Sequence, residues 1–172
     1  MPSNFLPSIN ASVFATIQTA DNQKELYDLL VDPLHEELYR KQTFDFLSEL
    51  SWGQQLLLST DYMQMHVGQG GFIQFIHNGY VSLLPNMIEQ MYQLNEGAMA
   101  NLLDDVLKIY VLNRDLIESA TSVQEFAKLY DELKEFEEID TRYQQLIKPF
   151  TINMLQYAAN NINEFATIIA DN

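Results

Sequence analysis

Apolar residues recur at three- and four-residue steps along most of this chain, and this spacing constrains the fold more than any other feature. The segment 122–147 shows it most clearly, because its aromatic and aliphatic residues form one continuous stripe. Such a stripe is typical of the buried face of an amphipathic helix. No run of strict alternation rich in β-branched residues indicates a strand. The spacing therefore predicts an all-α fold.

Start signals mark several of these helices. Asn22, Ser51 and Ser122 each stand three residues before a glutamate or glutamine, which is the pattern of a capping box. Asp32 precedes Pro33 as an N-cap precedes a proline in the first helical position. The predicted helices span residues 10–20, 23–31, 33–41, 51–66, 71–78, 82–94, 96–110, 122–147 and 149–169. We expect a single compact domain over residues 1–172, with about eight or nine helices.

Acidic residues dominate the charge, since 24 acids against 9 bases give a net charge of −15. Nucleic acid is itself densely negative, so we expect no direct binding to it. The apolar fraction of 47% excludes a disordered acidic tail. The composition therefore predicts a folded acidic protein.

The chain has no cysteine, and no basic residue precedes the apolar positions at its N-terminus. Disulfides, thiolate metal ligands and cysteine nucleophiles are therefore excluded, and no secretory signal is predicted. The uncharged stretch 62–88 is interrupted by amides, histidines and glycines, so it does not fit a membrane span. We expect a cytoplasmic protein without membrane contact.

Two groups of carboxylates are candidate partner-binding surfaces. The densest run, Asp131 to Asp140, holds six carboxylates and only Lys134 as a base. On a helix, acids at these steps have Cβ atoms about 5–6 Å apart, comparable with neighbouring phosphates on a DNA strand. The candidate residues are Asp131, Glu132, Glu135 and Glu138 in this run and Glu25, Asp28 and Asp32 nearer the N-terminus. A solvated helix face without a partner is the alternative interpretation.

The stretch GQGGFIQFIHNG, residues 68–79, predicts a tight corner between two helices. Gly68 is expected to end the first helix in the left-handed conformation, and Gly70 and Gly71 would let the second begin close to it. The stretch lacks the lysine and the preceding strand that a phosphate-binding loop requires.

Evidence for an enzyme is sparse. His66 and His77 flank the glycine corner, and Asp61 is an acid that could join them at a metal. The HExxH and paired ExxH spacings of metal sites are absent, and so is a nucleophile elbow. A metal-dependent hydrolase using His66 and His77 is therefore an alternative, and we expect a non-enzymatic protein without metal or cofactor.

Six residues of the corner form a short motif, Gly70, Gly71, Phe72, Gln74, Phe75 and Asn78. Together with LLDDVLKIY at residues 102–110, this motif resembles the signature of the bacterial DNA-mimic protein family over about residues 51–117. Gln69 stands where that family usually has asparagine. The resemblance implies an all-helical fold and a tendency to form homodimers. For the characterised member, it also implies binding to a transcription regulator through carboxylates arranged like DNA phosphates.

The acidity, the carboxylates and this resemblance predict a protein that binds the basic DNA-contacting face of a DNA-binding protein, such as a transcription regulator. An immunity-type inhibitor that covers the basic active site of a nuclease toxin is the alternative among interaction proteins.

Overall fold

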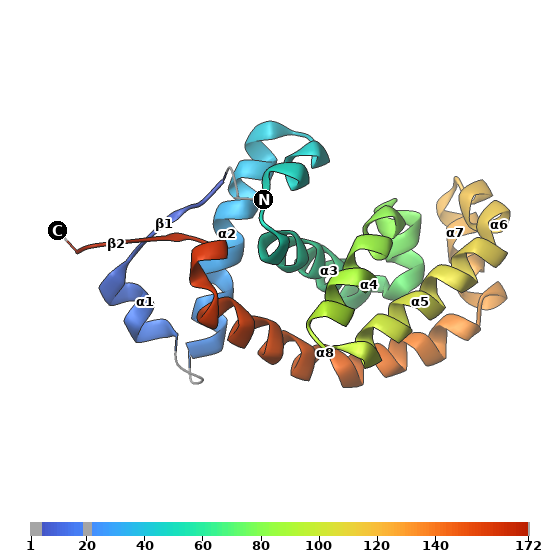
Figure 1. The fold of residues 1–172 in the computed structure, drawn as a ribbon. Helices are drawn as coiled ribbons and strands as arrows, with labels where there is room; N and C mark the ends of the chain where they lie inside the picture. The colour runs from blue at the N-terminus through green and yellow to red at the C-terminus, as the bar shows by residue number, and fades with distance from the viewer. Residues whose placement is uncertain (1–4, 19–21, 172) are drawn as a thin grey trace. The chain divides into compact units, whose positions relative to one another are not determined.

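The computed structural model describes residues 5–18 and 22–171, and helices dominate them, so the predicted all-α class is confirmed (Figure 1). In chain order the elements are β1 (Ser8–Asn10), α1 (Ala11–Ile17), α2 (Gln23–Lys41), η2 (Phe44–Glu49), α3 (Trp52–His77), η3 (Tyr80–Leu83), α4 (Leu84–Gln93), α5 (Gly97–Leu112), α6 (Arg114–Ser119), α7 (Val123–Glu132), α8 (Glu135–Asn160), η4 (Ile162–Glu164) and β2 (Thr167–Ile169). Among the helices of these residues, none is both long enough and apolar enough to cross a bilayer.

Two prolines that were expected to start helices lie inside longer ones. Pro33 is within α2 and Pro149 is within α8, so Asp32 is not an N-cap and the helices predicted at 23–31 and 33–41 are one. An internal proline removes a hydrogen bond and costs about 3 kcal/mol. However, α2 buries five apolar side chains on both sides of Pro33, and each contributes about 1.5–3 kcal/mol. The buried face therefore outweighs the lost bond.

Two of the three predicted capping boxes are present. Those at Ser51 and Ser122 each make both reciprocal hydrogen bonds. The Asn22 side chain makes no cap bond to α2, and its amide donates instead to the carbonyl of Thr16 at 2.9 Å. The spacing alone therefore predicted the sites but did not decide which side chain would turn toward its helix.

The chain divides into two compact units, residues 1–58 with 151–172 and residues 59–150. Each unit holds more acids than bases. The units are described separately below.

In the first unit, β1 and β2 pair in parallel, with Ile9 opposite Ile168 (Figure 1). The prediction of helix at residue 10 and at 167–169 is therefore wrong. Strands of three residues are too short to show an alternating pattern. Their pairing joins segments from opposite ends of the sequence, which local spacing cannot reveal.

Gln54 holds the segments next to these two strands. Its side chain is fully buried, and its amide donates to the carbonyls of Phe5 at 2.9 Å and Phe165 at 3.0 Å. The Ser51 hydroxyl donates to the carbonyl of Glu164 at 2.6 Å. Because buried polar groups need hydrogen-bond partners, the capping box of α3 also fixes the backbone that leads into β1 and β2.

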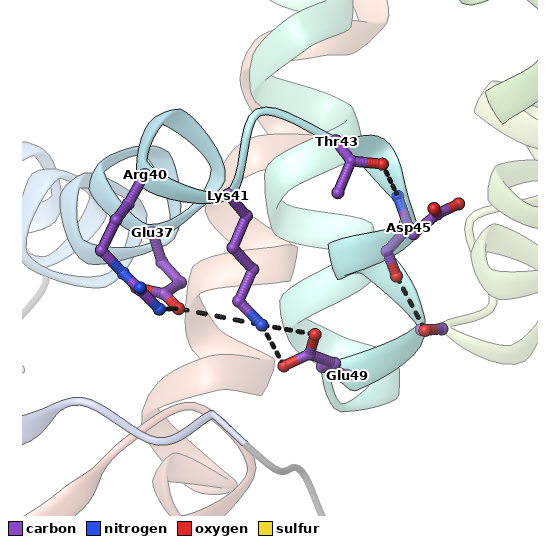
Figure 2. Close-up of polar contacts among 7 residues, drawn as sticks. Glu37, Arg40, Lys41, Thr43, Asp45 and Glu49 are labelled. Atoms are coloured by element: carbon purple, nitrogen blue, oxygen red, sulfur yellow. Dashed lines mark hydrogen bonds and ion pairs between the residues drawn. The ribbon is translucent and has the colours of Figure 1, made fainter.

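The C-terminal end of α2 carries paired charges (Figure 2). Arg40 donates to Glu37 one turn earlier, with Nε 2.8 Å from Oε2. Lys41 bonds Glu49 of η2 and lies 3.8 Å from Glu37. Both cations lie in the last turn, where positive charge is favourable to a helix. These bases are therefore already engaged by the acids around them.

In the second unit, α4 and α5 pack side by side (Figure 1). Asn95 between them adopts φ 62°, and the N–H of Glu96 donates to the carbonyl of Met91 at 2.8 Å, which closes the end of α4. The six-residue helix α6 follows α5 and was not predicted, because so short a segment gives almost no periodic signal.

Candidate functional site

The glycine corner interrupts α3 at two residues. Gly70 has φ −151° and ψ 25°, and Gly71 has φ 69° and ψ −172°. This Gly71 conformation is one that essentially only glycine adopts. The corner was predicted, but the expectation that Gly68 would be its left-handed residue is wrong. Gly68 remains helical, because the backbone turns where the corner meets Tyr130 and Asp140.

Tyr130 and Asp140 hold this corner with two hydrogen bonds, and we call the pair the clasp. The N–H of Phe72 donates to Oδ1 of Asp140 at 2.9 Å. The Tyr130 hydroxyl donates to the carbonyl of Gly70 at 2.7 Å. A Cβ atom on Gly71 would lie 2.2 Å from Oδ2 of Asp140, so the carboxylate approaches a space that only glycine leaves open.

The carboxyl group of Asp140 differs from the other acids of its run because it points inward. Burial raises the pKa of Asp140, and the hydrogen bond from Phe72 opposes that rise. Burial also raises the pKa of Tyr130, with a smaller contribution from the charge of Asp140. The clasp is therefore a partly desolvated polar contact inside the second unit.

The acidic run is carried by two helices and not by one. The predicted helix 122–147 breaks after Glu132, and α8 begins at Glu135. The buried Leu133 has φ −113° and ψ 56° at the break. This break places Glu135, Glu137 and Glu138 in the first turn of α8, where each negative charge is favourable by about 0.3–1 kcal/mol. Asp131 and Glu135 consequently do not form a single helical row.

Between the two clasp residues lie five exposed carboxylates, which we call the acidic corner. They are Asp131, Glu132, Glu135, Glu137 and Glu138. Lys134 lies 2.9 Å from Glu137 and 3.7 Å from Asp131. Within residues 5–18 and 22–171, the side chains of the other three make no ion pair or hydrogen bond. The acidic corner therefore presents three carboxylates to solvent without internal partners.

The second predicted group lies on α2 in the first unit. Glu25, Asp28 and Asp32 are spaced three and four residues apart, so they share one face of that helix. Lys24 forms an ion pair with Asp28. The structure therefore keeps this row but neutralises its central member.

The remaining motif residues stabilise the corner. Phe72 and Phe75 are fully buried, and the ring of Phe72 meets that of Tyr143 edge-on with centroids 5.4 Å apart. The Gln74 amide bonds the Gln69 side chain at 3.1 Å. These contacts give the motif a structural role that positions the helix after the corner.

The two histidines have neighbours other than a metal site. His66 lies 3.1 Å from the amide of Asn78, and its ring stacks on Tyr80 with centroids 4.4 Å apart. His77 lies against Phe126, with ring centroids 4.5 Å apart. Across the part of the chain that the structure describes, no three His, Cys, Asp or Glu side chains gather as metal ligands. The geometry gives the hydrolase alternative no support.

Sequence reasoning did not single out Tyr130 or Asp140. Asp140 was counted with the exposed acids, and Tyr130 with the apolar stripe. A signal was nevertheless present, because Asp140 follows Phe136 by four residues and precedes Tyr143 by three. That spacing places Asp140 on the buried face of α8.

Comparison with known proteins gives one family. The family model described as DMP19-like protein matches residues 48–161. No curated protein sequence matches the chain. The matched range contains the glycine corner, the clasp and the acidic corner, whereas Glu25, Asp28 and Asp32 lie outside it.

Proposed function

This chain belongs to the DMP19-like protein family, and from this premise we propose that it is a non-enzymatic DNA mimic. In this role it binds the basic DNA-contacting face of a DNA-binding protein, such as a transcription regulator. The contact region is the acidic corner, with Glu132, Glu135 and Glu138 as its unpartnered carboxylates. The α2 row of Glu25, Asp28 and Asp32 is a secondary candidate, because Lys24 already occupies Asp28.

The observation that carries the proposal is the state of the acids in the corner. Glu132, Glu135 and Glu138 are exposed and have no ion pair among the described residues, although the chain contains nine bases. An external basic surface would meet these carboxylates without first displacing an internal partner. Charged faces of this kind speed association and select partners of opposite charge.

Helix stability explains only some of these acids. The three in the first turn of α8 complement the positive end of the helix dipole. Asp131 and Glu132 lie in the last turn of α7, where negative charge is unfavourable by a similar amount. A partner that gains from these two charges gives a reason for their presence that the isolated helix does not.

The clasp gives the acidic corner a fixed base. Tyr130 and Asp140 lie on either side of it in sequence, and both bond the backbone of the glycine corner. A charged array that is already ordered loses less entropy on binding than a flexible one. The motif therefore supports recognition indirectly, by holding the segment that carries the charges.

The test uses the purified protein on a solid support, exposed to a lysate of the source cells at low salt and eluted by a salt step. The proposal expects DNA-binding proteins in the eluate and expects duplex DNA to displace them. Glu132, Glu135 and Glu138 changed together to Gln should abolish retention. The control changes Glu36, Glu89 and Asp115 to their amides, which removes the same charge from α2, α4 and α6.

Equal loss in both triple variants would assign binding to overall charge and refute the acidic corner. Retention that salt does not weaken would refute the DNA-mimic role. A nuclease in the eluate whose activity the protein inhibits would instead favour the immunity-type alternative.

A further inference from the structure

A groove between α6 and α7 opens beside the acidic corner. One face of α7 lines it through residues at steps of three and four, Glu125, Lys128, Leu129 and Glu132. The segment of α6 opposite contributes Leu116, Ser119 and Ala120. Glu132 belongs both to this groove and to the acidic corner, so the two surfaces are continuous.

The size of the groove limits what it can hold. Its volume is about 130 Å³, equivalent to about four water molecules at about 30 Å³ each. Pockets for cofactors and drug-sized ligands are larger, at about 300–1,000 Å³. The groove is therefore suited to one side chain of a partner.

The lining combines an apolar floor with one available charge. Ala120 and Leu129 are buried, and Leu116 forms a wall that is 36% exposed. The Glu125 carboxylate is already bonded within its capping box. The Glu132 carboxylate has no partner among the described residues. The free charge is therefore at the end that joins the acidic corner.

We propose that this groove receives an arginine side chain from the basic face of the DNA-binding partner. The aliphatic part of the arginine lies against Leu116, Ala120 and Leu129, and its guanidinium meets Glu132. This inference rests on the proposed function and identifies the one contact in it that is not purely electrostatic.

Arginine suits this groove better than lysine for two reasons. Its guanidinium is less strongly hydrated than an ammonium and can bond a carboxylate through two N–H groups. Its stem packs on apolar surface while the charge stays at the rim. Arginine is also common among the residues that dominate interface energies and among those that contact DNA.

Lys128 provides an internal check because it lines the same groove. A cation there repels an incoming guanidinium, so Lys128→Gln should strengthen binding. Lys148→Gln makes the same charge change at an exposed position outside the groove and should strengthen it less.

The experiment measures binding of two labelled helical peptides to the whole protein by fluorescence anisotropy over a range of salt concentrations. The peptides have equal length and charge, and one carries arginines where the other carries lysines. We expect the arginine peptide to bind several-fold more tightly and to shift the NMR amide signals of Ala120 and Leu129. We expect Leu116→Asn to weaken the arginine peptide several-fold at every salt concentration and to remove its advantage.

Leu6→Asn is the matched control, since Leu6 is 38% exposed and lies in the other unit. It should leave both affinities unchanged, and circular dichroism should show that both variants stay helical. The groove is refuted if binding is salt-sensitive and lost in the Glu132, Glu135 and Glu138 triple variant but unaffected by Leu116→Asn. Absence of any salt-sensitive binding would contradict the proposed function itself, which is a distinguishable result.

Discussion

Gly71→Ala is the sharpest test of how the glycine corner is built. An alanine at φ 69° and ψ −172° is strained by about 1–3 kcal/mol. Its Cβ would lie 2.2 Å from Oδ2 of Asp140, so the carboxylate must move and release the N–H of Phe72. A hydrogen bond to a charged group contributes about 1.5–3 kcal/mol. Because Asp140 is only partly buried, we expect the lower half of the combined range, about 2.5–4 kcal/mol.

The measurement is urea unfolding followed by circular dichroism, with hydrogen exchange of the amides in residues 59–150. Gly68→Ala is the matched control, since nothing lies within 4 Å of its added Cβ and the residue is helical. It should be neutral or stabilising by up to about 1 kcal/mol. In an Asp140→Ala background the contact is already absent, so Gly71→Ala should cost only the conformational part. Similar urea midpoints for Gly68→Ala and Gly71→Ala would refute this account of the corner.

Three further predictions concern buried and capping side chains. Because burial raises the pKa of Asp140 in the folded protein, its contribution to stability should fall as pH rises from its ordinary value of 3.8 through the folded value. A pH series of unfolding should show that fall, and Asp140→Asn should lack it. Hydrogen bonds from the capping box lower the pKa of Glu125, so its contribution should be present above pH 4.5 and decline on acidification, an effect that Glu125→Gln should abolish. Gln54→Ala should leave the carbonyls of Phe5 and Phe165 unpaired, costing about 1–3 kcal/mol for each carbonyl that water cannot reach. Faster hydrogen exchange in β1 and β2 would confirm this, and unchanged exchange would contradict it.

Apolar spacing predicted the helical class and most helix positions because burial of a helical face is the dominant local signal. It failed where two local preferences competed. Pro33 and Pro149 suggested helix starts, yet both helices continue because their buried faces continue. The stripe over 122–147 suggested one helix, yet the chain breaks after Glu132 and keeps Leu133 buried.

The candidate site was predicted only in part for a different reason. Composition and spacing identify carboxylates but not which of them turn inward. Asp140 and Glu138 look alike in the sequence, although one holds the glycine corner and the other is exposed. The contact between Asp140 and Phe72 joins residues far apart in sequence, so it follows from tertiary packing and not from a local pattern.

The pairing of β1 with β2 has a consequence for the order of events on the ribosome. Residues 59–150 form a continuous unit, so all of its chain has been made before the final segment emerges. The other unit needs both an early segment and the last one, because Ile9 pairs with Ile168. Domains tend to fold as units during synthesis, beginning with those completed first. The middle of this polypeptide can therefore mature ahead of its beginning, and the α2 segment must wait for translation to reach β2.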